Sequence, residues 1–264
     1  MADFTAKDVQ RLRQLTGVGM LDAKKALEEA QGDIDRAITV LREQGKASQS
    51  KRADRDASEG AVAVGSADGA VSIVQLRSET DFVAKSDEFV ALVASLADLV
   101  AAKGEGAVEE RSEDIERLKV TLQENISVGQ VVRIEAPADG VVDSYLHNQA
   151  GRGVNAVVVA LVGGSAELAH DVAAHIAFAR PIYISRDEVP EEEVAAERET
   201  VEKIARNEGK PDAALPKIVE GRLGGWYKER VLLDQAYVKD EKQTIAKLLG
   251  TAKVTRFAQV VVGD

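Results

Sequence analysis

A length of 264 residues allows two or three compact units, and a hydrophobic fraction of 45% is enough to bury a core. The formal net charge of −11 repels phosphate backbones, so we expect no direct binding of nucleic acid. The chain contains no cysteine, which excludes disulfides, thiolate zinc sites and cysteine nucleophiles.

Residues 1–45 predict a small bundle of three helices. Thr5 followed by Asp8 is typical of a helix start, because these side chains satisfy backbone amides that have no partner within the helix. Apolar residues recur at helical spacing in three patterns, and turns with glycine at 16–19 and 31–33 separate them. Helices this short can bury their apolar stripes only against one another. The arrangement resembles a ubiquitin-associated domain.

Residues 46–59 contain no apolar residue larger than alanine, so we expect a linker or a solvated helix. Beyond them, the order strand, loop, strand, helix occurs twice, about eighty positions apart. Strand-like runs lie at 61–64, 70–76, 140–146 and 154–162, and the two helices begin at Ser86 and Ser165. We predict an α+β fold with a duplicated core of antiparallel sheets, divided into subdomains at residues 60–139 and 140–264.

Further elements connect and follow the two copies. A charged helix at 108–125 and a strand at 128–134 lie between them, and residues 255–262 are again strand-like. Residues 190–229 predict a projecting, coiled-coil-like hairpin, because two charged helices carry only a narrow apolar seam. Gly224 and Gly225 weaken its second helix by about 1 kcal/mol each relative to alanine.

Enzymatic chemistry has little support in this sequence. The glycine pattern of residues 151–156 matches the dinucleotide-binding fingerprint, but that fingerprint must open a helix, and here it precedes a valine run typical of a strand. His170 and His175 lie five positions apart, off a common helical face, which favours structural roles over metal binding. We predict no enzyme, no catalytic residue, no cofactor and no bound metal.

The segment 78–84 places a carboxylate beside a large aromatic ring in a strand-to-helix connection. Physical reasoning leaves two interpretations of Phe82. The ring either folds back into the core or stays exposed as an anchor for a partner, as aromatic side chains on loops commonly do.

Two separate segments resemble signatures of the elongation factor Ts family. The family's amino-terminal domain is similar to residues 16–27, TGVGMLDAKKAL, followed by Gly32-Asp33-Ile34. The second signature is similar to residues 80–84, TDFVA. Stretches at 124–126, 145–147 and 173–181 follow in the family's order, although the family often has the histidine of the last stretch earlier.

The resemblance implies a guanine-nucleotide exchange factor that promotes GDP release from elongation factor Tu and binds its GDP-bound and nucleotide-free forms. It gives Asp81 and Phe82 the role of a wedge near the magnesium and phosphate site of that partner. Supporting contacts would come from Thr80, Val83, Met20, Lys24, Ile126 and His147. The longest apolar stretch is far too short to span a bilayer, so we expect a cytoplasmic protein without membrane contact.

Two other functions stay open at this point. The helical domain could belong to an adaptor that binds ubiquitin-like or nascent-chain partners, or the duplicated core could hold an unrecognised enzymatic site. Charged helices and a projecting hairpin fit a monomer and a dimer equally well.

Overall fold

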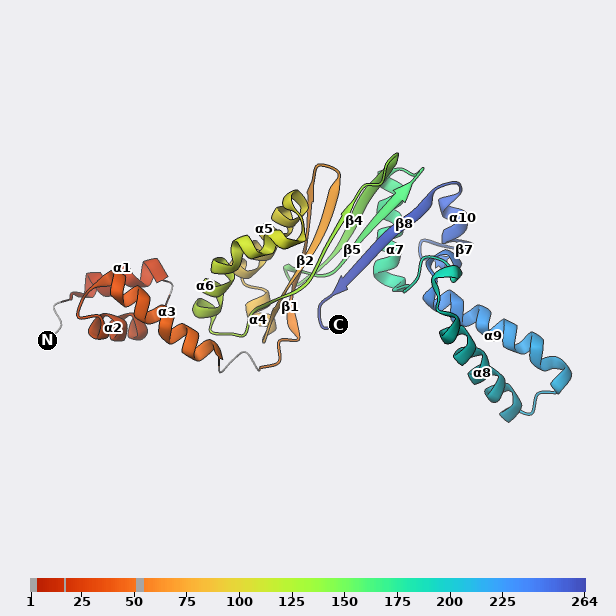
Figure 1. Ribbon diagram of the computed structural model, residues 1–264, viewed down its shortest axis with the longest axis horizontal. Helices are drawn as coiled ribbons and strands as arrows, with labels where there is room; N and C mark the ends of the chain where they lie inside the picture. Colours follow the sequence, from red (N-terminus) through yellow and green to blue (C-terminus); the bar gives the residue numbers. More distant parts are fainter. Residues whose placement is uncertain (1–3, 17, 51–54) are drawn as a thin grey trace.

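A computed structural model describes residues 4–16, 18–50 and 55–264 of the protein. The molecule is elongated, with a helical bundle at one end, a core of two sheets in the middle and a helical hairpin at the other end (Figure 1). Gly17 of the first predicted turn, residues 1–3 of the predicted bundle and residues 51–54 of the predicted linker lie outside the described residues. No helix in the described ranges is long and apolar enough to cross a membrane.

The bundle consists of α1 (Ala6–Thr16), α2 (Met20–Glu29) and α3 (Ile34–Ser50), packed around the fully buried Leu12 and Leu27. Thr5 and Asp8 form the predicted helix start: the backbone amide and hydroxyl of Thr5 both donate to Asp8 Oδ2 at 2.7 Å. Since α3 continues to Ser50, the first part of the segment expected to be a linker is helical. The bundle contacts the core through Val120.

The core contains two three-stranded antiparallel sheets with the same plan. The first sheet has the order β1 (Glu59–Ala67), β2 (Ala70–Ser78), β3 (Ser127–Glu135), and α5 (Asp87–Lys103) packs on it. The second has the order β4 (Gly140–Gln149), β5 (Arg152–Val162), β8 (Lys253–Val261), with α7 (Ala166–Ala179) packed on it. In each, a hairpin is followed by a helix, and the third strand pairs with the second. This repeat confirms the predicted α+β class with a duplicated core.

The two sheets pack face to face, and each carries its helix on the outer face, which gives four layers (Figure 1). Successive residues of a strand point to opposite faces. In β2, Val74 and Leu76 therefore pack with α5, whereas Val71 and Ile73 face the second sheet. The apolar runs in the sequence are continuous because both faces of these central strands are buried.

The turns of both hairpins are shorter than the sequence pattern predicted. In the first, residues 65–67 belong to β1, and only Asp68 and Gly69 form the turn, with φ of 45° and 77°. In the second, only Ala150 and Gly151 separate β4 from β5, with φ of 52° and 85°. Two-residue turns with positive φ match the twist of antiparallel strands, so small and polar residues near a turn can still belong to the ladder.

The segments between the repeated elements differ more from expectation. The predicted helix at 108–125 is a 3-10 segment, η1 (Glu105–Arg111), followed by α6 (Ser112–Leu122) and a left-handed Gln123. A short strand pair, β6 (Ala236–Tyr237) and β7 (Asp240–Thr244), and the helix α10 (Ile245–Leu249) precede β8 and were not predicted. Further 3-10 turns in the described part of the chain are η2 (Arg186–Glu188), η3 (Asp212–Ala214) and η4 (Leu232–Asp234).

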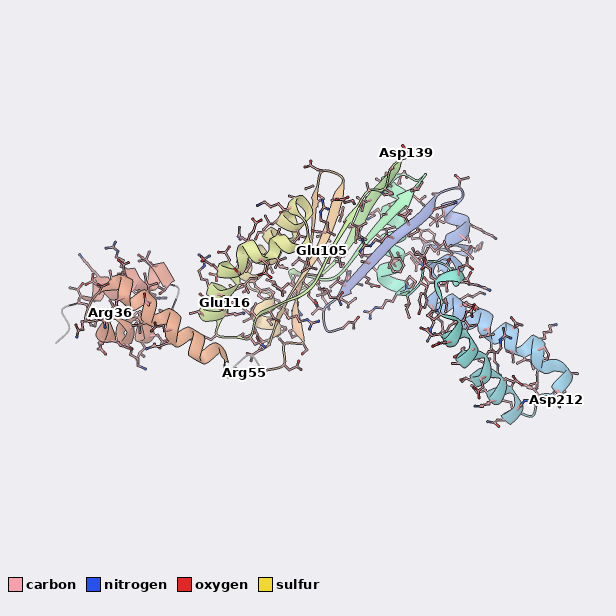
Figure 2. All side chains as sticks on the ribbon, in the orientation of Figure 1. Arg36, Arg55, Glu105, Glu116, Asp139 and Asp212 are labelled. Atoms are coloured by element: carbon pink, nitrogen blue, oxygen red, sulfur yellow. The ribbon has the colours of Figure 1, made fainter. Side chains whose placement is uncertain are left out.

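The hairpin consists of α8 (Glu191–Asn207) and α9 (Leu215–Arg230), which project from the second subdomain (Figure 1). Its seam is narrow, as predicted: Val201, Val219 and Leu223 form a small buried cluster. Charged side chains cover the outside of both helices (Figure 2), and Arg198 reaches across the seam to Glu220 at 2.6 Å.

The glycines of α9 give a direct test of hairpin stability. A Cβ atom added at Gly224 or Gly225 would meet nothing within 4 Å, and neither residue has a positive φ. We expect Gly224→Ala and Gly225→Ala each to stabilise the helix by about 1 kcal/mol and to slow hydrogen exchange of the α9 amides about fivefold. Gly209→Ala is the control: φ at Gly209 is 73°, so this change should destabilise the hairpin. Faster exchange in the Gly224 variant would contradict the expectation.

His175 of α7 is fully buried and joins three segments of the second subdomain. Its Nε2 donates to Gln235 Oε1 at 2.9 Å, and its Nδ1 accepts from the amide of Val238 at 3.3 Å. Burial lowers the pKa of His175 from its ordinary value, and the bond to Gln235 acts in the opposite direction. The neutral ring therefore holds α7 against residues on both sides of β6, Gln235 before it and Val238 after it.

This lowered pKa predicts a pH dependence of stability. As the pH falls, the unfolded chain takes up a proton on residue 175 before the folded protein does, so the stabilisation present above about pH 6.5 is lost below it. We expect urea unfolding between pH 7 and pH 5 to show a shallower pH dependence for His175→Gln than for the unchanged protein. His147→Gln, at an exposed position, is the control. Identical pH dependence in both variants would contradict a buried neutral histidine.

Candidate partner-binding site

The connection between β2 and α5 contains a single capped helical turn, α4 (Asp81–Ala84). Thr80 is the N-cap, and its side-chain oxygen accepts from the amide of Val83 at 3.3 Å. The hydroxyl of Ser86 donates to the Val83 carbonyl at 2.8 Å and closes the other end of the turn. The segment is therefore a defined turn rather than an open loop. We call Thr80 together with α4 the wedge turn.

Phe82 points into solvent from this turn. Its side chain is 84% exposed, the largest value among the large apolar residues that the structure describes. Ala84 is fully buried and Val83 packs on the core cluster of the first subdomain, so these two residues fix the opposite side of the turn. The sequence left open whether Phe82 folds back into the core or stays exposed, and in the structure the ring is exposed.

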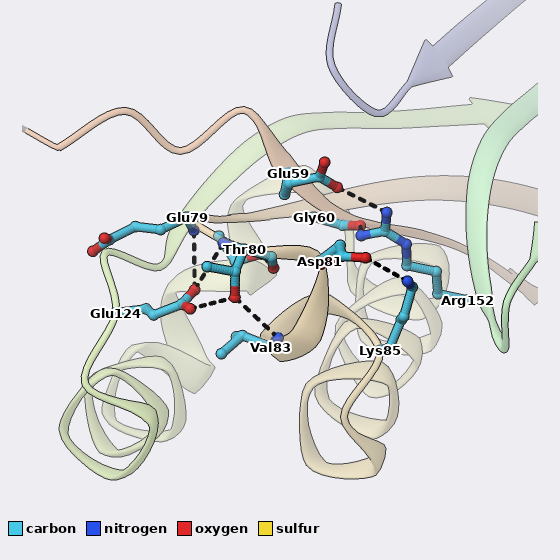
Figure 3. A network of polar contacts seen from close by, with 10 residues as sticks. Glu59, Gly60, Glu79, Thr80, Asp81, Val83, Lys85, Glu124 and Arg152 are labelled. Carbon is cyan, nitrogen blue, oxygen red and sulfur yellow. Dashed lines mark hydrogen bonds and ion pairs between the residues drawn. The ribbon is translucent and has the colours of Figure 1, made fainter.

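Asp81 lies beside Phe82 and carries a fixed charge. Its carboxylate accepts from Lys85 Nζ at 2.5 Å (Figure 3). The hydrogen bond to Lys85 lowers the pKa of Asp81, and the charge of Arg152 acts in the same direction more weakly. Asp81 is therefore ionised at neutral pH, and its carboxylate is held by a lysine one turn away.

A second carboxylate, Glu124, holds the start of the wedge turn (Figure 3). Its Oε2 accepts from the amides of Glu79 and Thr80, both at 3.1 Å, and its Oε1 accepts from the Thr80 hydroxyl at 2.5 Å. A hydrogen bond also runs in the opposite direction between the two segments: Glu79 Oε1 accepts from the amide of Asn125 at 2.7 Å. These bonds join the end of β2 to the segment that precedes β3.

Arg152 of the second subdomain contacts the first subdomain close to the wedge turn. This side chain is almost fully buried; it donates to the Gly60 carbonyl at 2.6 Å and to Glu59 Oε2 at 2.8 Å. Arg152 follows the turn between β4 and β5, so the tip of that hairpin lies beside the wedge turn (Figure 3). Asp139, just before β4, lies at the opposite end of the core (Figure 2).

The remaining predicted residues divide into three groups. Ile126 is fully buried in the same cluster as Ala84, beneath the wedge turn. His147 is exposed on β4, near the hairpin tip that carries Arg152. Met20, which is 64% exposed, and Lys24 lie on α2 of the separate bundle (Figure 1).

The sequence patterns did not point to Lys85, Arg152 or Glu59 as parts of this site. Arg152 stands out in the sequence only as a member of the glycine pattern of residues 151–156. In the structure that pattern covers the end of a tight turn and the start of β5 rather than the start of a helix. Within the described residues, no group of three or more histidine, aspartate or glutamate side chains could hold a metal ion. An exposed ring and a fixed carboxylate are groups suited to binding another macromolecule.

Comparison with known proteins identifies the family. A family model described as Elongation factor TS matches residues 79–264. Elongation factor Ts of Clavibacter michiganensis subsp. michiganensis is 45% identical over 282 residues, which cover 100% of both chains. Elongation factor Ts of Mycolicibacterium smegmatis is 46% identical over 285 residues, again with full coverage of both. These matches define a translation elongation factor. The chain belongs to the elongation factor Ts family, as its two signatures indicated.

Proposed function

We propose that this protein is a guanine-nucleotide exchange factor that promotes release of GDP from elongation factor Tu in the cytoplasm. The observation that carries the proposal is Phe82, which is 84% exposed on an anchored turn beside an ionised aspartate. Membership of the elongation factor Ts family supports the same conclusion.

The physical task of such a factor is to speed up a slow dissociation. A GTPase that binds GDP with nanomolar affinity holds it with about 12 kcal/mol, so spontaneous release is slow. The factor performs no bond chemistry. It accelerates release by binding the nucleotide-free form more tightly than the GDP-bound form, and linkage requires GDP to weaken binding of the factor by the same ratio.

In this proposal the wedge, Asp81 and Phe82, distinguishes the two forms of the partner. Phe82 enters an apolar pocket that exists when the phosphate and magnesium loops have shifted. Asp81 acts on the magnesium environment through its charge and hydrogen bonds. Because Lys85 holds the Asp81 carboxylate at 2.5 Å in the free protein, insertion exchanges this ion pair for contacts with the partner.

Other surfaces provide affinity for both forms. Met20 and Lys24 on the bundle contact the nucleotide-binding domain, and His147 contacts the partner from the second subdomain. The exposure of Leu15 and Leu21, 58% and 71%, is consistent with a partner contact by the bundle, because both lie on the same bundle as Met20. Thr80, Val83 and Ile126 act indirectly by holding the wedge turn.

The test is the release rate of a fluorescent GDP analogue from elongation factor Tu, with this protein at a small fraction of the partner concentration. We expect a large acceleration with repeated turnover of the factor. An unchanged rate with an active partner would refute exchange. The exposed Leu15, Met20 and Leu21 would then favour the alternative, an adaptor that binds its partners through the bundle.

A further inference from the structure

We propose that Glu124 is a positioning residue for nucleotide exchange: its carboxylate fixes the wedge turn in the orientation that presents Phe82. This inference rests on the proposed function. Glu124 would not need to touch the partner, and it would act entirely through the three hydrogen bonds that it accepts from residues 79 and 80 (Figure 3). We call these three bonds the Glu124 clamp.

The wedge turn depends on contacts from outside its own sequence. Four residues form only one helical turn, and a helix of this length is not stable in isolation, because nucleation fixes several dihedral angles for one hydrogen bond. The amides of Glu79 and Thr80 lie between the end of β2 and the first turn of α4, and both donate to Glu124 Oε2 at 3.1 Å. One carboxylate therefore satisfies two consecutive donors.

The third bond sets the N-cap. The hydroxyl of Thr80 donates to Glu124 Oε1 at 2.5 Å, so its lone pairs are directed toward the amide of Val83. Glutamate can accept all three bonds because an ionised carboxylate has two acceptor oxygens and no donor. Glutamine at this position would place an NH2 group against one set of donors.

A return contact fixes the Glu124 clamp from the other side. Glu79 accepts from the amide of Asn125 at 2.7 Å, and Asn125 Nδ2 donates to the Arg55 carbonyl at 2.9 Å. Residues 79–80 and 124–125 are thus joined by bonds in both directions. The position of the wedge turn is set by this connection at one end and by buried Ala84 at the other.

A fixed turn matters because ordering a flexible anchor on binding costs free energy. Without the Glu124 clamp, Phe82 would still be exposed, but the turn would sample several orientations before insertion. Contacts made by the bundle and the second subdomain would be unchanged. We therefore expect the maximal rate of GDP release to fall, with little change in the concentration at which the factor half-saturates.

The experiment compares Glu124→Gln with the matched control Glu116→Gln. Glu116 lies on α6 just before the clamp (Figure 2); its half-exposed side chain forms an ion pair with Lys119 at 2.6 Å. We expect Glu124→Gln to lower the maximal release rate about tenfold and Glu116→Gln to leave it unchanged. Full activity of Glu124→Gln would overturn the inference.

A second arm separates positioning from general damage. In a Phe82→Ala background, Glu124→Gln should cause no further loss, because the clamp acts only through the wedge. An equal fold-loss in both backgrounds would assign Glu124 a general structural role and overturn the inference. Thr80→Val removes one of the three donors together with the N-cap bond to the amide of Val83, so it should also lower the rate.

A third arm does not depend on exchange activity. Hydrogen exchange of the amides of Glu79, Thr80 and Val83 should be faster in Glu124→Gln than in the unchanged protein and the Glu116→Gln control. If the unchanged protein does not accelerate GDP release, the proposed function fails, and this arm alone decides whether Glu124 holds the turn. Unchanged protection of these amides would overturn the clamp itself.

Discussion

Phe82→Ala is expected to reduce the acceleration of GDP release at least about 30-fold, because a central aromatic anchor commonly contributes about 2 kcal/mol or more to an interface. The same change should alter the free energy of unfolding by no more than about 0.5 kcal/mol, since the side chain is 84% exposed. Stopped-flow fluorescence of a bound GDP analogue measures the first quantity, and urea unfolding measures the second.

Phe178→Ala is the matched control for this prediction. Phe178 is also a phenylalanine with 80% exposure, but it lies at the end of α7 in the second subdomain. Its replacement should leave the release rate unchanged. Equal losses in the two variants would show that the rate responds to any lost apolar surface, and it would contradict a specific wedge.

Ile126→Ala should have the largest effect on stability, a loss of about 2 to 5 kcal/mol in the free energy of unfolding. Ile126 is fully buried in the cluster that contains Leu76, Phe89 and Ala84, so truncation removes apolar contacts and leaves a cavity beneath the wedge turn. Ile126→Val removes one methyl group and should cost about 0.5 to 1.5 kcal/mol. Urea unfolding at pH 7 measures both.

The control for this core substitution is Val128→Ala, two residues further along the chain. Val128 is 36% exposed, so its truncation should cost clearly less than that of Ile126. Similar losses of stability at both positions would contradict the conclusion that Ile126 stabilises the core of the first subdomain.

The sequence predicts most of the elements because their patterns are local. The stripes of the bundle and the apolar runs of β2 and β5 are set by residues a few positions apart. Short polar elements carry no such pattern. β7 has the sequence DEKQT, which contains no apolar residue, and its strand geometry comes from pairing with β6.

The site was predictable to a smaller extent, for a similar reason. The pair Asp81 and Phe82 is evident as a carboxylate next to a rare aromatic, but the direction of the ring depends on the burial of Val83 and Ala84 against distant elements. Glu124 lies 44 residues from Thr80, and no local pattern reports that contact. Arg152 is separated from Gly60 by 92 positions and comes from the other subdomain.

The central claim is that the wedge distinguishes the nucleotide-free partner from the GDP-bound partner. The most direct measurement is the pair of dissociation constants of this protein for elongation factor Tu with and without GDP, by calorimetry, for the unchanged chain and Phe82→Ala. We predict much tighter binding to the nucleotide-free form, by the same ratio by which the factor weakens GDP binding, and a much smaller ratio for Phe82→Ala. Equal affinity for both forms, or an unchanged ratio in Phe82→Ala, would contradict the account.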